Sequence, residues 1–87
     1  MRLIELIQGS STWTGDDTTI YVARPWSCDA DATLISPAPD TTEPVEQGGR
    51  LYDYFLETFI AREVIEGFAG SDEKRCQRLI DYAENDA

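Results

Sequence analysis

The sequence contains no histidine, and its two cysteines, Cys28 and Cys76, lie far apart along the chain. Without an imidazole there is no histidine general base and no Ser–His or Cys–His nucleophile pair. A structural zinc site needs clustered Cys or His ligands, which two separate cysteines cannot supply. No glycine-rich phosphate loop follows a strand and opens a helix. These absences predict a protein that is not an enzyme and that holds no metal and no cofactor.

Acidic side chains are the remaining candidates for chemistry. A pair of carboxylates can act as acid and base, as in glycosidases, but among 17 acids the sequence singles out no pair. Asp29 and Asp31 have the spacing to chelate a hard cation, yet the further oxygen ligands and the glycine of a calcium loop are missing. The sequence therefore favours solvated turn acids over a catalytic or metal-binding pair.

Basic residues are scarce: seven stand against the 17 acids, which gives a formal net charge of −10 and an isoelectric point near 4.1. Such a field repels nucleic acid and anionic membranes, and it attracts basic surfaces. Acidity also keeps a small protein soluble without any partner. The charge predicts no direct contact with nucleic acid or membrane, and it leaves open whether a basic protein is bound.

Long apolar runs are also absent. The first seven residues hold a very short apolar run with Glu5 inside it, which is unlike a signal peptide, and no stretch of about 20 apolar residues could span a bilayer. We therefore expect a cytoplasmic protein in a reducing compartment with both thiols free. Isolated cysteines of this kind are most often small core residues; a disulfide formed after purification is the alternative.

The chain is long enough for one domain, residues 1–87, and its 41% hydrophobic content is normal for a folded protein. Hydrophobic periodicity and turn residues divide it into successive elements. The expected elements are a helix over 3–7, strands over 18–23 and 32–36, a long loop over 36–49, a strand over 51–56, a helix over 59–68 ended by Gly70, and a last helix capped by Ser71. They predict an α+β fold in the order α-β-β-β-α-α, with a small three-stranded antiparallel sheet covered by helices.

Residues 50–70 allow a second interpretation. Apolar side chains repeat here every four residues: Tyr52, Leu56, Ile60, Val64 and Phe68. This repeat fits one long helix. The aromatic content of 51–56 instead fits a strand, after which Thr58 can cap a helix that begins at Phe59. We expect the strand followed by the helix.

A core follows from these elements. The residues expected to be buried are Ile20, Val22, Leu34, Phe59, Ile60, Val64, Leu79 and Ile80. On this basis Phe59→Ala should cost about 3–5 kcal/mol of stability.

The acids are unevenly distributed. No base lies between Arg24 and Arg50, and Pro37, Pro39 and Pro44 stiffen this segment, which lowers the entropy lost on docking. Trp26, at its start, is either an interface anchor or a core residue. The predicted partner-binding residues are Trp26, Asp29, Asp31, Asp40, Glu43 and Glu46. A second acidic patch ends the chain and remains an alternative: Asp81, Glu84 and Asp86.

Several segments resemble a family of small uncharacterised bacterial proteins from immunity-like or mobile-element contexts. The residues that carry the resemblance are Ile20-Tyr21-Val22, Pro25-Trp26, Pro44-Val45-Glu46, Gly49, the stretch 52–58 and the closing Tyr82-Ala83-Glu84-Asn85-Asp86-Ala87. The resemblance implies an α+β fold and a strand-to-helix boundary at Thr58, and it implies no activity. In length, acidity and lack of catalytic residues the chain also resembles phage-encoded anti-CRISPR inhibitors.

Two kinds of function fit these observations. The first is a stoichiometric inhibitor, a monomer or weak dimer, that presents carboxylates to a basic site on a protein partner. That partner would be a nucleic-acid-binding effector, such as a CRISPR effector, or a toxin neutralised by an immunity protein. The alternative is a structural or assembly module that acts through an apolar face. An enzyme is the least favoured hypothesis.

Overall fold

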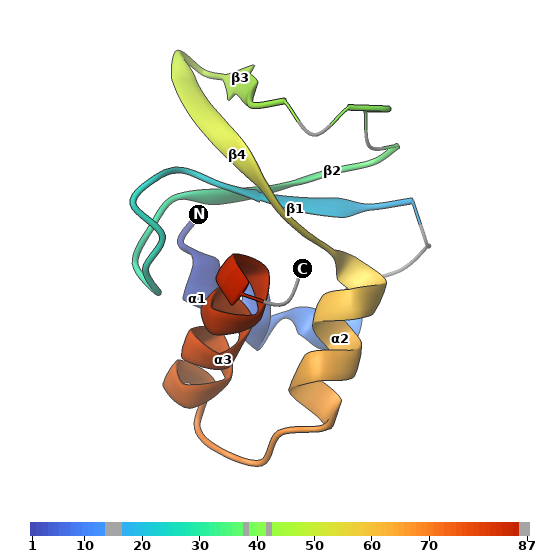
Figure 1. Ribbon diagram of the computed structural model, residues 1–87, viewed down its shortest axis with the longest axis vertical. Coiled ribbons are helices and arrows are strands. Elements are labelled where there is room, and N and C mark those ends of the chain that lie inside the picture. The colour runs from blue at the N-terminus through green and yellow to red at the C-terminus, as the bar shows by residue number, and fades with distance from the viewer. Residues whose placement is uncertain (14–16, 38, 42, 86–87) are drawn as a thin grey trace.

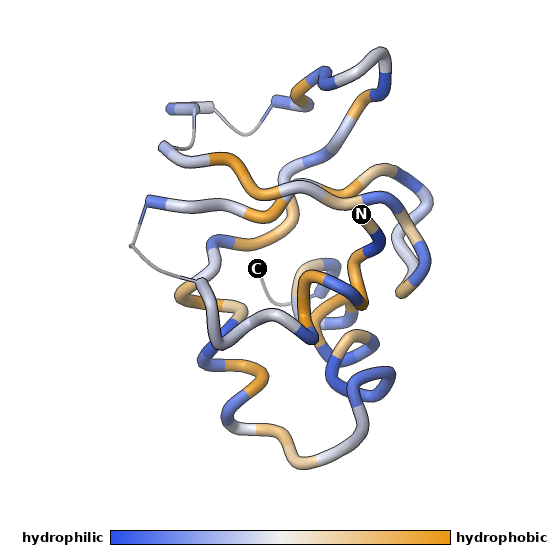
Figure 2. The backbone as a smooth tube through the Cα atoms, turned by 180° about the vertical axis from the view of Figure 1, so that it is seen from behind, coloured by the Kyte–Doolittle hydropathy of each residue, from blue (hydrophilic) through white to orange (hydrophobic). Residues whose placement is uncertain are grey.

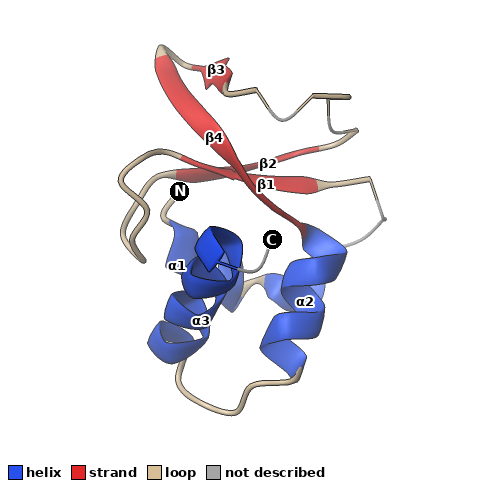
Figure 3. Ribbon diagram, viewed as in Figure 1, coloured by secondary structure: helices blue, strands red, loops and turns tan. Residues whose placement is uncertain are grey.

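A four-stranded antiparallel sheet, covered on one face by three helices, forms the protein (Figures 1 and 3). The structure is a computed structural model that describes residues 1–13, 17–37, 39–41 and 43–85. Its elements are α1 (Leu3–Gln8), the short 3-10 turn η1 (Ser10–Thr12), β1 (Thr19–Val22), β2 (Ala32–Ile35), β3 (Val45–Gln47), β4 (Arg50–Glu57), α2 (Thr58–Glu66) and α3 (Asp72–Asn85). The strands lie in the order β2-β1-β4-β3.

The predicted α+β class and the antiparallel sheet are confirmed, but the sheet has four strands and not three. The additional strand, β3, lies within the segment that we expected to be a loop over 36–49. It pairs with β4 in the register Val45↔Tyr52, and Gln47↔Arg50 closes a two-residue hairpin. Gly48 and Gly49 form its turn with φ of +58° and +78°, the positive values that such hairpins require.

The hairpin turn gives a stability prediction. Gly49→Ala should lower the free energy of unfolding by about 1 kcal/mol, because a Cβ disfavours positive φ. Nothing lies within 4 Å of the position that the added Cβ would take, so the cost is conformational and not steric. Gly9→Ala is the control, since Gly9 has φ of −92°. Urea denaturation of both variants measures the difference, and equal losses would contradict it.

A strand followed by a helix occupies residues 50–66, so the single long helix is wrong. The boundary falls at Thr58, as expected, but the proposed cap is wrong. Thr58 is the first helical residue, and both its amide and its hydroxyl donate to the carbonyl of Thr18, at 3.0 and 3.2 Å. The helix ends at Gly67 and not at Gly70, where the Gly67 amide donates to the Glu63 carbonyl.

The N-terminal helix and the last helix are confirmed. Ser71 caps α3, since its hydroxyl accepts from the Lys74 amide at 3.3 Å. Along the helices, hydrophobic and hydrophilic positions alternate in short stretches, as expected when one face of each helix is buried (Figure 2). The buried stripe of α3 is Cys76, Leu79 and Ile80.

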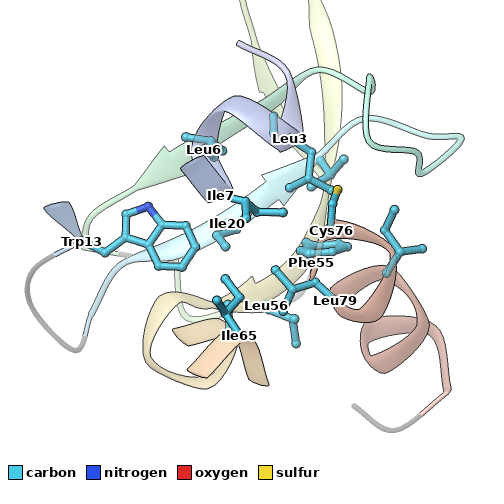
Figure 4. Close-up of a cluster of buried hydrophobic side chains, with 14 residues drawn as sticks. Leu3, Leu6, Ile7, Trp13, Ile20, Phe55, Leu56, Ile65, Cys76 and Leu79 are labelled. Atoms are coloured by element: carbon cyan, nitrogen blue, oxygen red, sulfur yellow. The ribbon is translucent and has the colours of Figure 1, made fainter. Parts of the chain in front are cut away.

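A β-bulge in β4 places two consecutive side chains in the core. Ile20 of β1 pairs with Leu56, whereas Tyr21 pairs with Tyr54, so Phe55 has no partner across the ladder. Phe55 and Leu56 are both buried among the side chains that face the helices (Figure 4). The extra residue interrupts the alternation of side chains along the strand, so that two consecutive large side chains pack in the same core.

The predicted core is partly correct. Ile20, Val22, Leu79 and Ile80 are buried, and Ile60 and Val64 are half-buried at the edge of the core. Two predictions are wrong: Leu34 is 36% exposed and Phe59 is 42% exposed. Cys76 is buried, as expected of an isolated cysteine. The core also contains residues that we did not predict: Leu3, Leu6, Ile7, Trp13, Ala32, Phe55, Leu56, Ala61 and Ile65.

The error at Phe59 has a geometric cause. The inward stripe of α2 runs through Thr58, Ala61 and Ile65, with the spacing of three and four that defines one helical face. Phe59 follows the first of these positions and is therefore turned away from the core. Leu34 points to the helix side of the sheet, opposite Ile20, but it lies on the edge strand β2, where less of the helix layer covers it.

Candidate acidic docking surface

Two of the five predicted acids form ion pairs within the protein. Asp29 lies 3.0 Å from the guanidinium of Arg2, and Asp31 lies 2.8 Å from that of Arg50. Arg2 and Arg50 lie outside the stretch without bases in the sequence, but the fold brings their guanidinium groups to its carboxylates. These pairs are exposed, so each contributes little stability, but they reduce the negative charge that a partner would meet at this end of β2.

The other three acids, Asp40, Glu43 and Glu46, are exposed and form no ion pair among the described residues. They belong to what we call the β2–β3 segment, residues 36–47. The described residues of this segment run on the side of the sheet away from the helices (Figure 1). Asp29 and Asp31 precede β2 whereas Asp40 and Glu43 follow it, so the fold separates the two paired acids from these two along one strand. Glu46 lies in β3, one residue before the pair Gln47↔Arg50.

A surface hollow of about 330 Å³ lies beside Asp40. Asp17, Asp40 and Glu57 contribute three carboxylates to its wall, and no basic side chain lines it among the described residues. Pro37, Pro39, Thr19 and Tyr54 complete the lining. The hollow is therefore acidic, with an aromatic ring and two rigid prolines in its wall.

Hydroxyl groups donate hydrogen bonds to two of these carboxylates. The Tyr54 hydroxyl donates to Oε1 of Glu57 at 3.1 Å, and the Ser36 hydroxyl donates to Oδ1 of Asp17 at 3.3 Å. Burial raises the pKa of Tyr54, and the charge of Glu57 raises it further, so the phenol stays protonated as a donor. The ring of Tyr54 rests edge-on against the buried Tyr21, with centroids 5.9 Å apart.

The acidic wall with its aromatic ring suits a cation. An ammonium or guanidinium group in the hollow would meet two or three carboxylates in charge-assisted hydrogen bonds. The π face of Tyr54 would add a cation–π contact if the group lay over it. A phosphate would be repelled by the same carboxylates.

Trp26, the predicted anchor, is half-buried and packs against its own chain. Its ring meets Phe55 edge-to-face with centroids 4.9 Å apart, and its Nε1 donates to the Val22 carbonyl at 3.2 Å. The guanidinium of Arg24 lies 3.6 Å from the centroid of the same ring. Arg24 is held in turn by Asp53 at 3.1 Å. The structure thus places Trp26 at the margin of the core, and it does not line the acidic hollow.

The second acidic patch is partly engaged as well. Glu84 lies 3.6 Å from Arg24, and the carboxylate of Asp81 accepts a hydrogen bond from the side-chain amide of Gln77 at 3.1 Å. Asp86 lies outside the described residues. This patch offers less unpaired charge than the β2–β3 segment.

Sequence reasoning missed Asp17, Tyr54 and Glu57 as parts of this surface. They come from the approach to β1 and from the end of β4, and the pairing of Thr19 with Glu57 brings them together. No local pattern singles them out, because their proximity depends on which strands are neighbours.

Among the described residues, no group of three or more His, Cys, Asp or Glu side chains is placed to hold a metal ion. No helix in the described ranges is long and apolar enough to cross a membrane. No family model, curated protein or solved structure matches the chain. The resemblances noted from the sequence therefore stay predictions.

Proposed function

We propose that the protein binds a basic protein partner through the β2–β3 segment and the acidic hollow beside it. The observation that carries this proposal is the distribution of unpaired charge. Asp40, Glu43 and Glu46 are exposed without an ion pair in the described structure, while Asp29 and Asp31 are neutralised from within. Exposed carboxylates without an ion pair remain available to a partner.

The protein recognises this partner through the lysine and arginine side chains on the partner's surface. One of them would enter the hollow lined by Asp17, Asp40 and Glu57, and others would meet the exposed Glu43 and Glu46. Complementary charge of this kind raises the association rate and selects the partner. A basic surface that normally receives phosphates, in a nucleic-acid-binding effector or a toxin, would be blocked by carboxylates that take their place. The protein would then act as an inhibitor without catalysis.

The alternative, assembly through an apolar face, has less support. The exposed large hydrophobic residues are Met1, Leu34, Leu51 and Phe59. Met1 and Leu34 line a common hollow, but Leu51 and Phe59 lie at the starts of β4 and α2 and line none of the surface hollows described. Light scattering distinguishes the two functions, since an assembly held by apolar contacts persists in high salt whereas an acidic monomer stays small at every ionic strength.

Capture of the partner tests the proposal. Immobilised protein should retain a basic protein from a host lysate at low salt and release it as ionic strength rises, because exposed charges are screened beyond about 10 Å at 0.1 M salt. Mass spectrometry of the eluate identifies the retained protein. Recovery of an acidic or neutral partner, or retention that is unchanged by salt, would contradict the proposed mode of binding.

A further inference from the structure

The two cysteines, distant in sequence, are neighbours in the fold. Sγ of Cys28, in the β1–β2 connection, lies 3.9 Å from the carbonyl oxygen of Glu73 on α3. Glu73 precedes Cys76 by three positions, so both lie on the same face of that helix. Cys28 also packs against the buried cluster that contains Cys76. Burial, and then a hydrogen bond with Cys28 that favours the protonated thiol, raise the pKa of Cys76, which agrees with two adjacent sulfurs.

The two thiols differ in access. Cys28 is half-buried and lines a surface cavity of about 680 Å³, whereas Cys76 is fully buried and does not line it. Two cations, Arg2 and Lys74, and two carboxylates, Asp29 and Glu73, line this cavity, so its wall carries no net charge. A small reagent can therefore reach Cys28 from solvent, with Cys76 behind it.

The backbone around Cys28 is fixed to the helix layer. The Cys28 carbonyl accepts from the Ile4 amide at 3.0 Å, and the Ala30 carbonyl accepts from the Leu3 amide at 2.9 Å. These bonds tie the β1–β2 connection to α1, which packs directly on α3. The two sulfurs are thus held near each other by the fold and do not meet only by fluctuation of a loose loop.

We propose that Cys28 and Cys76 are a redox-active pair that a low-molecular-weight disulfide such as glutathione disulfide converts to an internal disulfide. In the first step the Cys28 thiolate attacks one sulfur of the reagent, which forms a mixed disulfide and releases one thiolate. In the second step the Cys76 thiol gives its proton to solvent, and the resulting thiolate attacks the Cys28 sulfur and releases the second thiolate. The protein loses two thiol protons and two electrons, and the reagent is reduced to two thiols.

Intact-mass analysis of the reduced, full-length protein incubated with glutathione disulfide tests this assignment. The wild type should first gain one glutathione and then reach a mass two hydrogens below the reduced form, with Cys28 and Cys76 joined in the peptide map. Cys76→Ala, which keeps the site apolar, should stop at the mixed disulfide on Cys28. Cys28→Ser should remain reduced while folded and keep a Cys76 thiol that reacts with iodoacetamide only after unfolding.

Two results would overturn the proposal. One is a wild type that stops at the mixed disulfide, which would mean that the sulfurs cannot meet. The other is a Cys28→Ser variant that is modified at Cys76 as fast as the wild type reacts, which would mean that Cys28 is not the accessible thiol. Both results are read on the protein alone, so they are independent of the proposed partner.

Discussion

Phe55→Ala is expected to destabilise the protein by about 3–5 kcal/mol. Phe55 is 1% exposed, lies at the bulge of β4 and supports the ring of Trp26 at 4.9 Å. Its removal leaves a cavity between the sheet and the helices, which the surrounding side chains fill only in part. Because small domains have a total stability of about 5–15 kcal/mol, the variant should lose a large share of its free energy of unfolding.

Phe59→Ala is the matched control, since it deletes the same side chain at a position that is 42% exposed. With its ring half in solvent, this variant loses less buried surface and leaves no closed cavity, so its cost should be about 1 kcal/mol. Urea denaturation of the two variants, followed by tryptophan fluorescence, gives both free energies. Equal losses would show that the bulge does not direct Phe55 into the core.

The contrast between these two rings shows how far local pattern predicts this fold. The β-branched run over 18–23 and the shorter run over 32–36 predicted β1 and β2 within two residues at either end, and their antiparallel pairing is confirmed. Thr58 marked the start of a helix correctly. The face that this helix buries is set by hydrogen bonds from Thr58 to Thr18, a residue 40 positions earlier, and such a contact leaves no trace in local spacing.

β3 was missed for a related reason. A strand of three residues has no periodicity of its own, and it exists because β4 offers a partner across the turn at Gly48 and Gly49. The prolines before it made the whole stretch resemble a loop. The two glycines followed by the aromatic strand were a hairpin signal that the proline content obscured.

The candidate site, too, could be predicted from the sequence only in part. The acid-rich run identified Asp40, Glu43 and Glu46, since exposure follows from charge and from the lack of bases nearby in sequence. It could not reveal that Arg2 and Arg50 approach Asp29 and Asp31, because these contacts form between separate elements. The adjacency of Cys28 and Cys76 was hidden in the same way.

Reversal of Asp40, Glu43 and Glu46 to lysine should slow association with the basic partner by roughly 10- to 100-fold at low salt. Exposed charges at a rim act mainly on the encounter rate, and this change replaces attraction with repulsion at the proposed surface. Thermal stability should change little, because none of the three acids forms an ion pair in the described structure. Stopped-flow or biosensor kinetics against the captured partner at several salt concentrations measures the effect.

A second triple variant separates position from total charge. Glu63, Glu66 and Glu73 are exposed on α2 and α3, in the helix layer on the other side of the sheet (Figure 1). Their reversal to lysine changes the net charge from −10 to −4, as the first variant does, since each of three reversals adds two positive charges. If the β2–β3 segment is the docking surface, this control should associate close to the wild-type rate. Equal slowing in both variants would mean that the partner responds to the overall field and that no particular surface is recognised.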